Sequence, residues 1–145
     1  MKFQNTGFEK PVIREYKNIR QPYPLFYVSK LEDPRIVSAK VRSKGDHQIT
    51  VTMPDLSYMG FSTLAKMSGY HNPLKLIEWT LQLFDDLVEH NVVPIDIHDS
   101  NIMSDGKSLV LVDYEQFWSW DRNREAYGRW RMDQQIKVWA KKPKI

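Results

Sequence analysis

The 145-residue sequence contains no cysteine, which excludes disulfide bonds and thiolate zinc sites. It has no apolar run long enough to cross a bilayer, and its first ten residues lack the apolar stretch of a signal peptide. Internal repeats and low-complexity segments are missing as well. These absences lead us to expect a cytoplasmic protein that makes no membrane contact.

The composition is ordinary for a globular protein of about one domain, with 41% hydrophobic and 27% charged residues. The net charge is only +3, and part of this excess lies near the C-terminus in Lys141, Lys142 and Lys144. A basic tail of this kind is usually solvated, and it can also contact nucleic acid or acidic partners.

The first 31 residues contain one segment with helical spacing and one ambiguous segment. Residues 11–21 predict a helix, because Pro11 suits a first turn and apolar side chains recur at Val12, Ile13, Tyr16 and Ile19. Two prolines at positions 22 and 24 are expected to end it. Residues 25–31 fit either a further helical turn or a strand.

Two runs rich in β-branched residues follow, at 35–42 and 48–53. The turn residues at 43–46 lie between them, so we predict an antiparallel hairpin. Residues 73–90 predict the clearest helix, with Asn72 as N-cap. Its apolar repeat is expected to consist of Leu74, Ile77, Leu81, Phe84 and Val88.

The remaining chain predicts an extended segment at 92–97, a turn at 104–107 and a short strand at 108–112. The aromatic and charged residues of 118–139 predict one or two further helices. The fold class is therefore α+β, with few strands and one long central helix.

The most specific pattern is Asp96, Asn101 five residues later, and Asp113 after a turn and an apolar strand. This pattern resembles the catalytic and metal-binding loops of the protein-kinase-like superfamily. Asp96-Ile97-His98-Asp99-Ser100-Asn101-Ile102 is similar to its aminoglycoside-phosphotransferase-like variants, and Asp113-Tyr114-Glu115 stands where D-F-G is usual. The alternative is that Asp96 and Asn101 only cap a tight loop and that Asp113 only ends a strand.

The resemblance implies a phosphotransferase that uses ATP and Mg²⁺. Asn101 and Asp113 would be the magnesium ligands, since Mg²⁺ prefers hard oxygen donors. Asp96 would orient or deprotonate the attacking hydroxyl, and His98 would order the loop.

The resemblance also extends upstream. Residues 33–56 are similar to strands four and five and the hinge, so adenine would lie beside Met53 and Leu56. The predicted helix at 11–21 would be helix αC with Glu15 as its ion-pairing glutamate, and Lys2 would be the strand-three lysine. Lys2 could equally be a disordered residue, and Glu15 an exposed helix charge. We reject Lys40 as the strand-three lysine, because too few residues then separate it from the hinge.

The pattern departs from ordinary kinases in three ways. No glycine-rich loop precedes Lys2, Pro94 replaces the usual His or Tyr, and only 32 residues follow Asp113. We therefore predict a single minimal domain over 1–145, a trimmed two-lobed kinase-like fold. Residues 1–56 would form a small antiparallel-sheet N-lobe lacking the glycine-rich loop, and residues 57–145 a reduced helical C-lobe. Small effector and viral kinases shed parts of the C-lobe in this way.

Two functions follow from this reading. The first is an atypical kinase that transfers the ATP γ-phosphate to a protein or small-molecule hydroxyl. The second is a pseudokinase-like binding module that regulates or inhibits a partner protein without catalysis. Both lead us to expect a protein substrate or partner, and an unrelated α+β binding domain is the remaining alternative.

The C-terminal segment interleaves aromatic with basic residues. Such interleaving suits a protein interface, and it is also compatible with single-stranded nucleic acid. The plainer interpretation is that the aromatics form a small C-lobe core with the basic residues outside. The aromatics are Phe117, Trp118, Trp120, Tyr127, Trp130 and Trp139, and the basic residues are Arg122, Arg124, Arg129, Arg131 and Lys137.

Overall fold

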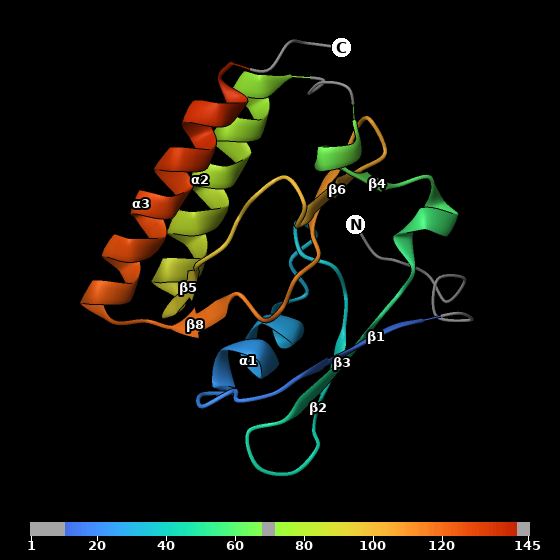
Figure 1. Ribbon diagram of the computed structural model, residues 1–145, viewed down its shortest axis with the longest axis vertical. Coiled ribbons are helices and arrows are strands. Elements are labelled where there is room, and N and C mark those ends of the chain that lie inside the picture. The colour runs from blue at the N-terminus through green and yellow to red at the C-terminus, as the bar shows by residue number, and fades with distance from the viewer. Residues whose placement is uncertain (1–10, 68–71, 142–145) are drawn as a thin grey trace.

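The computed structural model describes residues 11–67 and 72–141 (Figure 1). Three sheets and three α-helices make up this part of the chain. The α-helices are α1 (Tyr23–Leu31), α2 (Pro73–Glu89) and α3 (Arg122–Trp139), and the short 3₁₀ helices are η2 (Leu56–Met59) and η3 (Leu64–Lys66). The strands are β1 (Val12–Tyr16), β2 (Lys40–Ser43), β3 (Ile49–Met53), β4 (Ser62–Thr63), β5 (Val92–Pro94), β6 (Ile102–Ser104), β7 (Leu109–Leu111) and β8 (Phe117–Ser119).

The first sheet has the order β1-β3-β2 and is antiparallel throughout. β1 pairs with β3 from Val12 opposite Met53 to Tyr16 opposite Ile49. The helix predicted over 11–21 is therefore wrong. The β-branched and aromatic residues of this segment suit a strand, and hydrogen bonds to β3 outweigh an apolar spacing that also fits a helix.

Helix α1 resolves the ambiguous segment at 25–31, which is helical. Pro22 and Pro24 stand at its start, where a proline's missing N–H costs nothing. They therefore begin this helix and do not end an earlier one. Leu25 and Val28 are buried one helical turn apart, which orients α1 toward the core.

The predicted hairpin is confirmed as β2 and β3, although its first strand is shorter than expected. Residues 35–39 leave the sheet and contact the C-terminal half of the chain. Ile36 forms a parallel bridge with Leu111, and the Val37 N–H donates to the Leu111 carbonyl at 2.9 Å. This crossing ties the first sheet to the β6–β7 hairpin.

Helix α2 is confirmed, with the side chain of Asn72 accepting from the Lys75 N–H at 3.1 Å. The apolar face differs from the predicted one, because Leu74 is 69% exposed and Leu81 is also exposed. The buried residues are Pro73, Leu76, Thr80, Leu83, Phe84 and Leu87. The spacing alone fits two overlapping stripes, and only the packing of α3 and β5 decides between them.

The C-terminal half contains two small sheets and the α2–α3 helix pair (Figure 1). β5 pairs with β8, and β6 lies between β4 and β7. The segment 118–139 holds one helix after β8. Of the aromatic residues from 117 to 139, Phe117 and Trp139 are buried, whereas Trp118, Trp120, Tyr127 and Trp130 are exposed, so the core interpretation holds for only part of the set.

Helix α3 approaches α2 and β5 closely at Gly128. A Cβ there would lie 3.0 Å from a Val93 methyl carbon, 3.1 Å from the Phe84 ring and 3.2 Å from the Pro94 carbonyl oxygen. A side chain at this point of the helix therefore fits only if its neighbours move by a few tenths of an ångström. No described helix is both long and apolar enough to cross a membrane.

Gly128→Ala is expected to destabilise the protein, although alanine is the better helix former. The propensity gain is about 1 kcal/mol, and overpacking costs about 1–3 kcal/mol. We expect a net loss of about 1 kcal/mol in the free energy of unfolding, measured by urea denaturation at unchanged m-value. Asn123→Ala, at an exposed position of α3, is the matched control and should be neutral or slightly stabilising. A stability gain for Gly128→Ala would contradict the close approach.

Candidate active site

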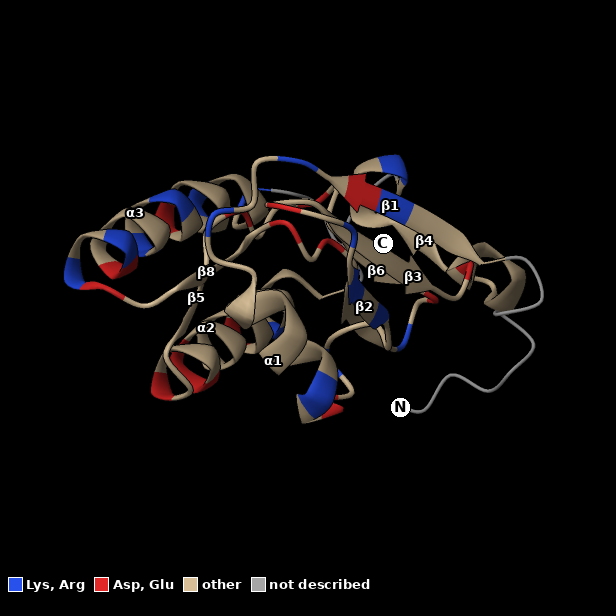
Figure 2. Ribbon diagram, turned by 90° about the horizontal axis from the view of Figure 1, so that it is seen from below, with Lys and Arg blue, Asp and Glu red and all other residues tan. Residues whose placement is uncertain are grey.

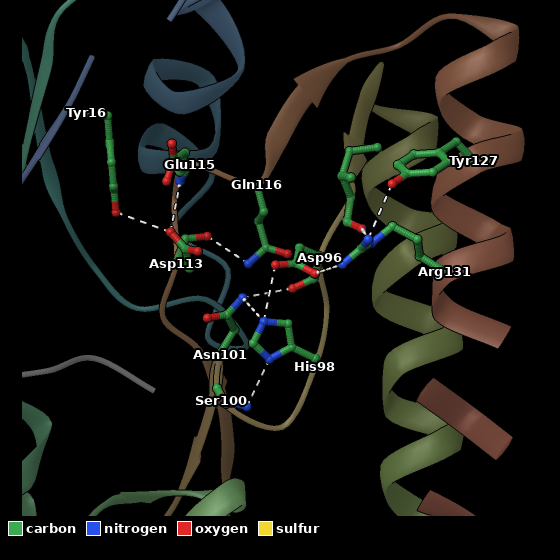
Figure 3. Close-up of polar contacts among 11 residues, drawn as sticks. Tyr16, Asp96, His98, Ser100, Asn101, Asp113, Glu115, Gln116, Tyr127 and Arg131 are labelled. Atoms are coloured by element: carbon green, nitrogen blue, oxygen red, sulfur yellow. Dashed lines mark hydrogen bonds and ion pairs between the residues drawn. The ribbon is translucent and has the colours of Figure 1, made fainter. Parts of the chain in front are cut away.

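The three residues singled out by the sequence lie on two adjacent loops. Asp96 and Asn101 lie between β5 and β6, and Asp113 follows β7 directly. The β6–β7 pairing aligns the loops, and the Val112 N–H donates to the Asn101 carbonyl at 3.0 Å. Figure 3 shows the three side chains gathered between β1, α1 and α3. Figure 2 shows acidic segments in the loops between α3 and the first sheet.

Asn101 is held with its amide in one orientation. Its Nδ2 group donates to the Asp96 carbonyl at 2.9 Å and lies 3.2 Å from His98 Nε2. Because the nitrogen donates to the Asp96 carbonyl, the amide oxygen points away from His98 (Figure 3). That oxygen is the atom a hard cation would use.

His98 orders this loop as a neutral ring. The Ser100 N–H donates to Nδ1 at 3.0 Å, so Nδ1 carries the lone pair and Nε2 carries the proton. Nε2 lies 3.1 Å from Asp96 Oδ2 and donates to it. The imidazole thus fixes the second oxygen of the Asp96 carboxylate.

Asp96 also forms an ion pair with Arg131 of α3, through its other oxygen Oδ1. The same guanidinium donates from Nε to the Ile95 carbonyl at 3.1 Å and from Nη1 to the Tyr127 hydroxyl at 3.3 Å. The hydrogen bond to Asp96 is the main cause that raises the pKa of Arg131. The helix therefore holds the Asp96 carboxylate in place from the opposite side to His98 (Figure 3).

Asp113 accepts hydrogen bonds from the Tyr16 hydroxyl at 3.2 Å and from the Glu115 N–H at 3.1 Å. Burial raises the pKa of the Tyr16 phenol, and the nearby Asp113 charge raises it further. Burial, followed by the Asp113 charge, likewise raises the pKa of Glu115. Tyr16 and Glu115 are thus the two titratable neighbours whose pKa values respond to the Asp113 carboxylate.

Tyr114 anchors the loop to the rest of the chain. Its ring is buried edge-on against Phe117, and its hydroxyl donates to the Val37 carbonyl at 2.8 Å. Val37 belongs to the segment that links the first sheet to β7. The direction in which Asp113 points therefore depends on contacts with both halves of the fold.

Gln116 supplies a test of whether this site suits a cation. Its Nε2 group donates to the Asp113 carbonyl at 2.8 Å, while its Oε1 atom, on a side chain only 4% exposed, has no hydrogen-bond partner among the described residues. Buried polar oxygens without a partner call for a water or an ion. Within residues 11–67 and 72–141 no three His, Asp or Glu side chains gather as a metal site. The residues fit a cation that keeps waters and phosphate oxygens among its ligands, as Mg²⁺ does.

The other predicted site residues are less close to this centre. Met53 ends β3, Leu56 begins η2, and both side chains are buried. The residues between them form the link for which the sequence predicts a hinge. Glu15 lies on β1 and forms a surface ion pair with Lys44 at 2.6 Å, so its assignment to a helix is wrong. Lys2 lies outside the described residues.

Along the chain, β1, α1, β2 and β3 follow one another as strand three, helix αC, strand four and strand five do in the family that the sequence resembles. The sheet order β1-β3-β2 agrees with this alignment. β1 therefore takes the place of strand three, and α1 takes the place of helix αC. β1 reads VIREY and contains no lysine, and α1 reads YPLFYVSKL and contains no glutamate. The lysine–glutamate pair implied by the resemblance is therefore missing at these described positions. Tyr16 is the β1 residue that reaches Asp113 instead.

Sequence reasoning missed three residues of the site: Tyr16, Gln116 and Arg131. The apolar spacing of residues 12–19 places Tyr16 on a helix, and Arg131 is one of several basic residues in the C-terminal segment. No local signal distinguishes Arg131 from Arg129, which instead pairs with Glu125 and Asp85. A heavier weight on β-propensity at residues 12–16 could have found the strand that carries Tyr16.

A larger hollow in the described part of the chain lies elsewhere. It has a volume of about 800 Å³ and lies between the first half of α2 and the β6–β7 hairpin. Trp79, Leu109 and Lys107 are among its lining residues, and none of Asp96, Asn101 or Asp113 is. This hollow borders the turn of the β6–β7 hairpin, whereas Asn101 and Asp113 lie at the hairpin's other end.

Comparison with known proteins supports the fold. No protein-family model matches the chain, and no curated protein matches it by sequence. A solved structure of the Rio2 kinase from Chaetomium thermophilum, as an ADP/Mg²⁺-phosphoaspartate complex, is similar with a TM-score of 0.58 and 19% identity. The match covers 84% of this chain and 37% of that one.

The described chain thus has a trimmed protein-kinase-like fold, and the predicted fold class is confirmed. It is an α+β arrangement of small antiparallel sheets and three α-helices. An identity of 19% establishes the fold alone. Because the chain spans just over a third of its structural neighbour, the activity of the whole neighbour does not transfer with the fold.

Proposed function

We propose that this protein is an atypical kinase that transfers the γ-phosphate of ATP to a hydroxyl group. The observation that carries the proposal is the position of Asp96, Asn101 and Asp113 on two neighbouring loops of a kinase-like fold, which the Asn101–Asp96 and Val112–Asn101 hydrogen bonds hold together. The structural neighbour, an ADP/Mg²⁺ complex, supports nucleotide use. Met53 and Leu56 would border the adenine, as hinge residues do in the family that the sequence resembles.

The reaction needs positioning and charge neutralisation more than covalent help. Mg²⁺, when bound with the nucleotide, would screen the charge that develops on the phosphates. The Asp113 carboxylate and the Asn101 amide oxygen are the side chains that would hold it, with the free Gln116 oxygen nearby. Tyr16, which donates to Asp113, would help to keep that carboxylate oriented.

Asp96 would act on the acceptor. The acceptor oxygen forms a bond to the γ-phosphorus, the bond from that phosphorus to the β–γ bridging oxygen breaks, and ADP leaves with the electron pair. The hydroxyl proton passes to an oxygen of Asp96. His98 and Arg131 hold the carboxylate so that its remaining lone pairs face the reacting hydroxyl.

A second candidate is a pseudokinase-like module that regulates a partner protein by contact. Two observations favour it. β1 and α1 lack the lysine–glutamate pair, and a tyrosine occupies the strand position facing Asp113. The Asp96 carboxylate is also engaged on both oxygens. This candidate predicts binding to a partner protein with no phosphate turnover.

The deciding experiment incubates the purified chain with Mg²⁺, γ-labelled ATP and a mixture of protein and small-molecule hydroxyl acceptors. The proposed function predicts transfer of label that requires Mg²⁺. Treatment of the labelled product with hydroxylamine distinguishes two linkages. An acyl phosphate on an aspartate is cleaved, whereas a phosphate ester on a hydroxyl is not. Calorimetric binding of Mg·ATP is measured in parallel. Binding without any transfer favours the pseudokinase, and the absence of both overturns nucleotide use.

A further inference from the structure

The hollow between the first half of α2 and the β6–β7 hairpin, here called the α2 hollow, takes no part in the proposed site. Its volume of about 800 Å³ lies within the roughly 300–1,000 Å³ that is typical of pockets for whole small molecules. Among its apolar lining residues, Leu64 and Leu76 are buried, and Trp79 and Leu109 are partly buried. A concave apolar surface of this size gains free energy when a ligand displaces the water that covers it.

Two lining residues favour an aromatic ligand over an aliphatic one. Trp79 of α2 and Met67, which follows η3, are both partly buried, and both line the α2 hollow. An indole ring makes offset or edge-to-face contacts with a second ring, and a methionine sulfur also contacts aromatic rings favourably. An acyl chain gains neither kind of contact. The lining therefore matches a ligand with an aromatic body.

The cationic side chains of the α2 hollow come from both of its walls. Lys75 lies in the first turn of α2 and Lys107 in the turn between β6 and β7, and both are exposed. Within the described residues, neither lysine forms an ion pair. Arg35 also lines the hollow, but Asp33 and Asp86 hold its guanidinium at 2.6 Å and 2.9 Å. The two lysine charges thus remain for a ligand.

The excess of positive charge in the α2 hollow is small. Glu78 is the carboxylate among its described lining residues, so two lysines against one glutamate leave an excess of one positive charge. Asp105 lies in the same turn as Lys107, but its Oδ1 atom accepts from the backbone N–H groups of residues 107 and 108 at 2.9 Å and 2.7 Å. A ligand with a single negative charge complements this arrangement.

Ser104 supplies a neutral polar contact in the α2 hollow. Its side chain is only 6% exposed, and its Oγ atom accepts from the Gly106 N–H at 3.0 Å. No described residue accepts the hydroxyl proton of Ser104. Because a hydroxyl donates one hydrogen bond as well as accepting, this proton is available to an oxygen of a ligand.

We propose that the α2 hollow binds a small aromatic carboxylate, with its rings against Trp79 and Met67 and its carboxylate between Lys75 and Lys107. The apolar contact provides most of the binding free energy, and the lysines fix the orientation of the ligand. This inference goes beyond the proposed function and does not depend on it, because none of the three residues that carry the proposed function lines the hollow.

The first test uses naphthoate, a two-ring aromatic carboxylate, as the probe and naphthamide as its neutral counterpart. Calorimetry measures the affinity of the full chain for each. We expect naphthamide to bind at least about tenfold more weakly, because it loses the charge-assisted hydrogen bonds to the lysines. The double variant Lys75→Gln/Lys107→Gln should weaken naphthoate binding by the same factor. Lys137→Gln/Lys141→Gln removes the same charge from exposed positions at the end of α3 and should bind naphthoate as the wild type does.

The second test locates the probe through the methionine methyl signals in NMR spectra. The chain has six methionines, and a Met67→Leu variant identifies the signal of Met67. Ring currents of bound naphthoate should shift that signal. Met132, which is 4% exposed on α3 and does not line the hollow, is the internal control and should keep its position.

Each part of the proposal has a result that overturns it. Equal affinities for naphthoate and naphthamide would show that the hollow does not select a negative charge. Undiminished binding to the Lys75→Gln/Lys107→Gln variant, or an unmoved Met67 signal, would place the probe elsewhere. Tighter binding of decanoate than of naphthoate would assign the hollow to an acyl chain, and displacement of naphthoate by ATP without Mg²⁺ would assign it to a nucleotide.

Discussion

Asp113→Ala is expected to abolish binding of Mg·ATP. The variant removes the only carboxylate that the proposed cation site takes from the loop after β7. Loss of an outer partner alone typically lowers metal affinity by about 10–100-fold, so loss of a direct ligand should cost at least about 100-fold. Titration calorimetry should show heat for the wild-type chain and none for the variant at concentrations that saturate the wild type.

The control for this experiment is Asp133→Ala, which removes an exposed carboxylate from α3. It has the same change in charge and should bind Mg·ATP as the wild type does. Far-ultraviolet circular dichroism checks that both variants keep their helices. Equal heats for Asp113→Ala and the wild type would show that the nucleotide binds elsewhere, with the 800 Å³ hollow beside α2 as the first place to look.

Asp96→Asn is expected to abolish transfer while leaving nucleotide binding intact. Asparagine has nearly the same shape, but it cannot accept the hydroxyl proton. General-base catalysis contributes about 10²–10⁴-fold, so kcat should fall by that factor with little change in the KM for ATP. The measurement is steady-state transfer of γ-label, with calorimetry of Mg·ATP on the same preparation.

Arg131→Lys is the useful companion, because it keeps a positive charge beside Asp96 but loses the fork that also bonds Ile95 and Tyr127. It should retain part of the activity that Asp96→Asn loses. If Asp96→Asn keeps full activity, Asp96 only shapes the loop. The pair of variants therefore separates a proton-accepting role from a structural one.

The loop pattern of the site could be predicted from the sequence because its spacing is local. Asp96, Asn101 and Asp113 are separated by a short loop and a hairpin, so chain geometry limits how far apart they can lie. The strand Leu109–Leu111 and the turn before it carry strong local signals, and both are present. The same holds for α2, where Asn72 and Pro73 mark the start.

Residues 11–31 could not be assigned in this way, because the structure of their first strand depends on a distant partner. Residues 12–16 have apolar side chains at positions that suit a helix as well as a strand. Pairing with residues 49–53 decides the matter, since each strand residue gains hydrogen bonds that no local pattern records. Glu15 was misplaced for this reason, and Tyr16 was missed.

The sequence by itself determined the α+β class and the two loops that carry Asp96, Asn101 and Asp113, since these rest on local propensity and short spacing. Only the tertiary structure decided which face of α2 is buried, which helix stands beside the first sheet, and which arginine meets Asp96. These outcomes depend on contacts between residues far apart in the chain, such as Arg131 with Asp96 and Tyr16 with Asp113. Such contacts are selected by the packing of the whole core, and a short window of sequence holds no record of it.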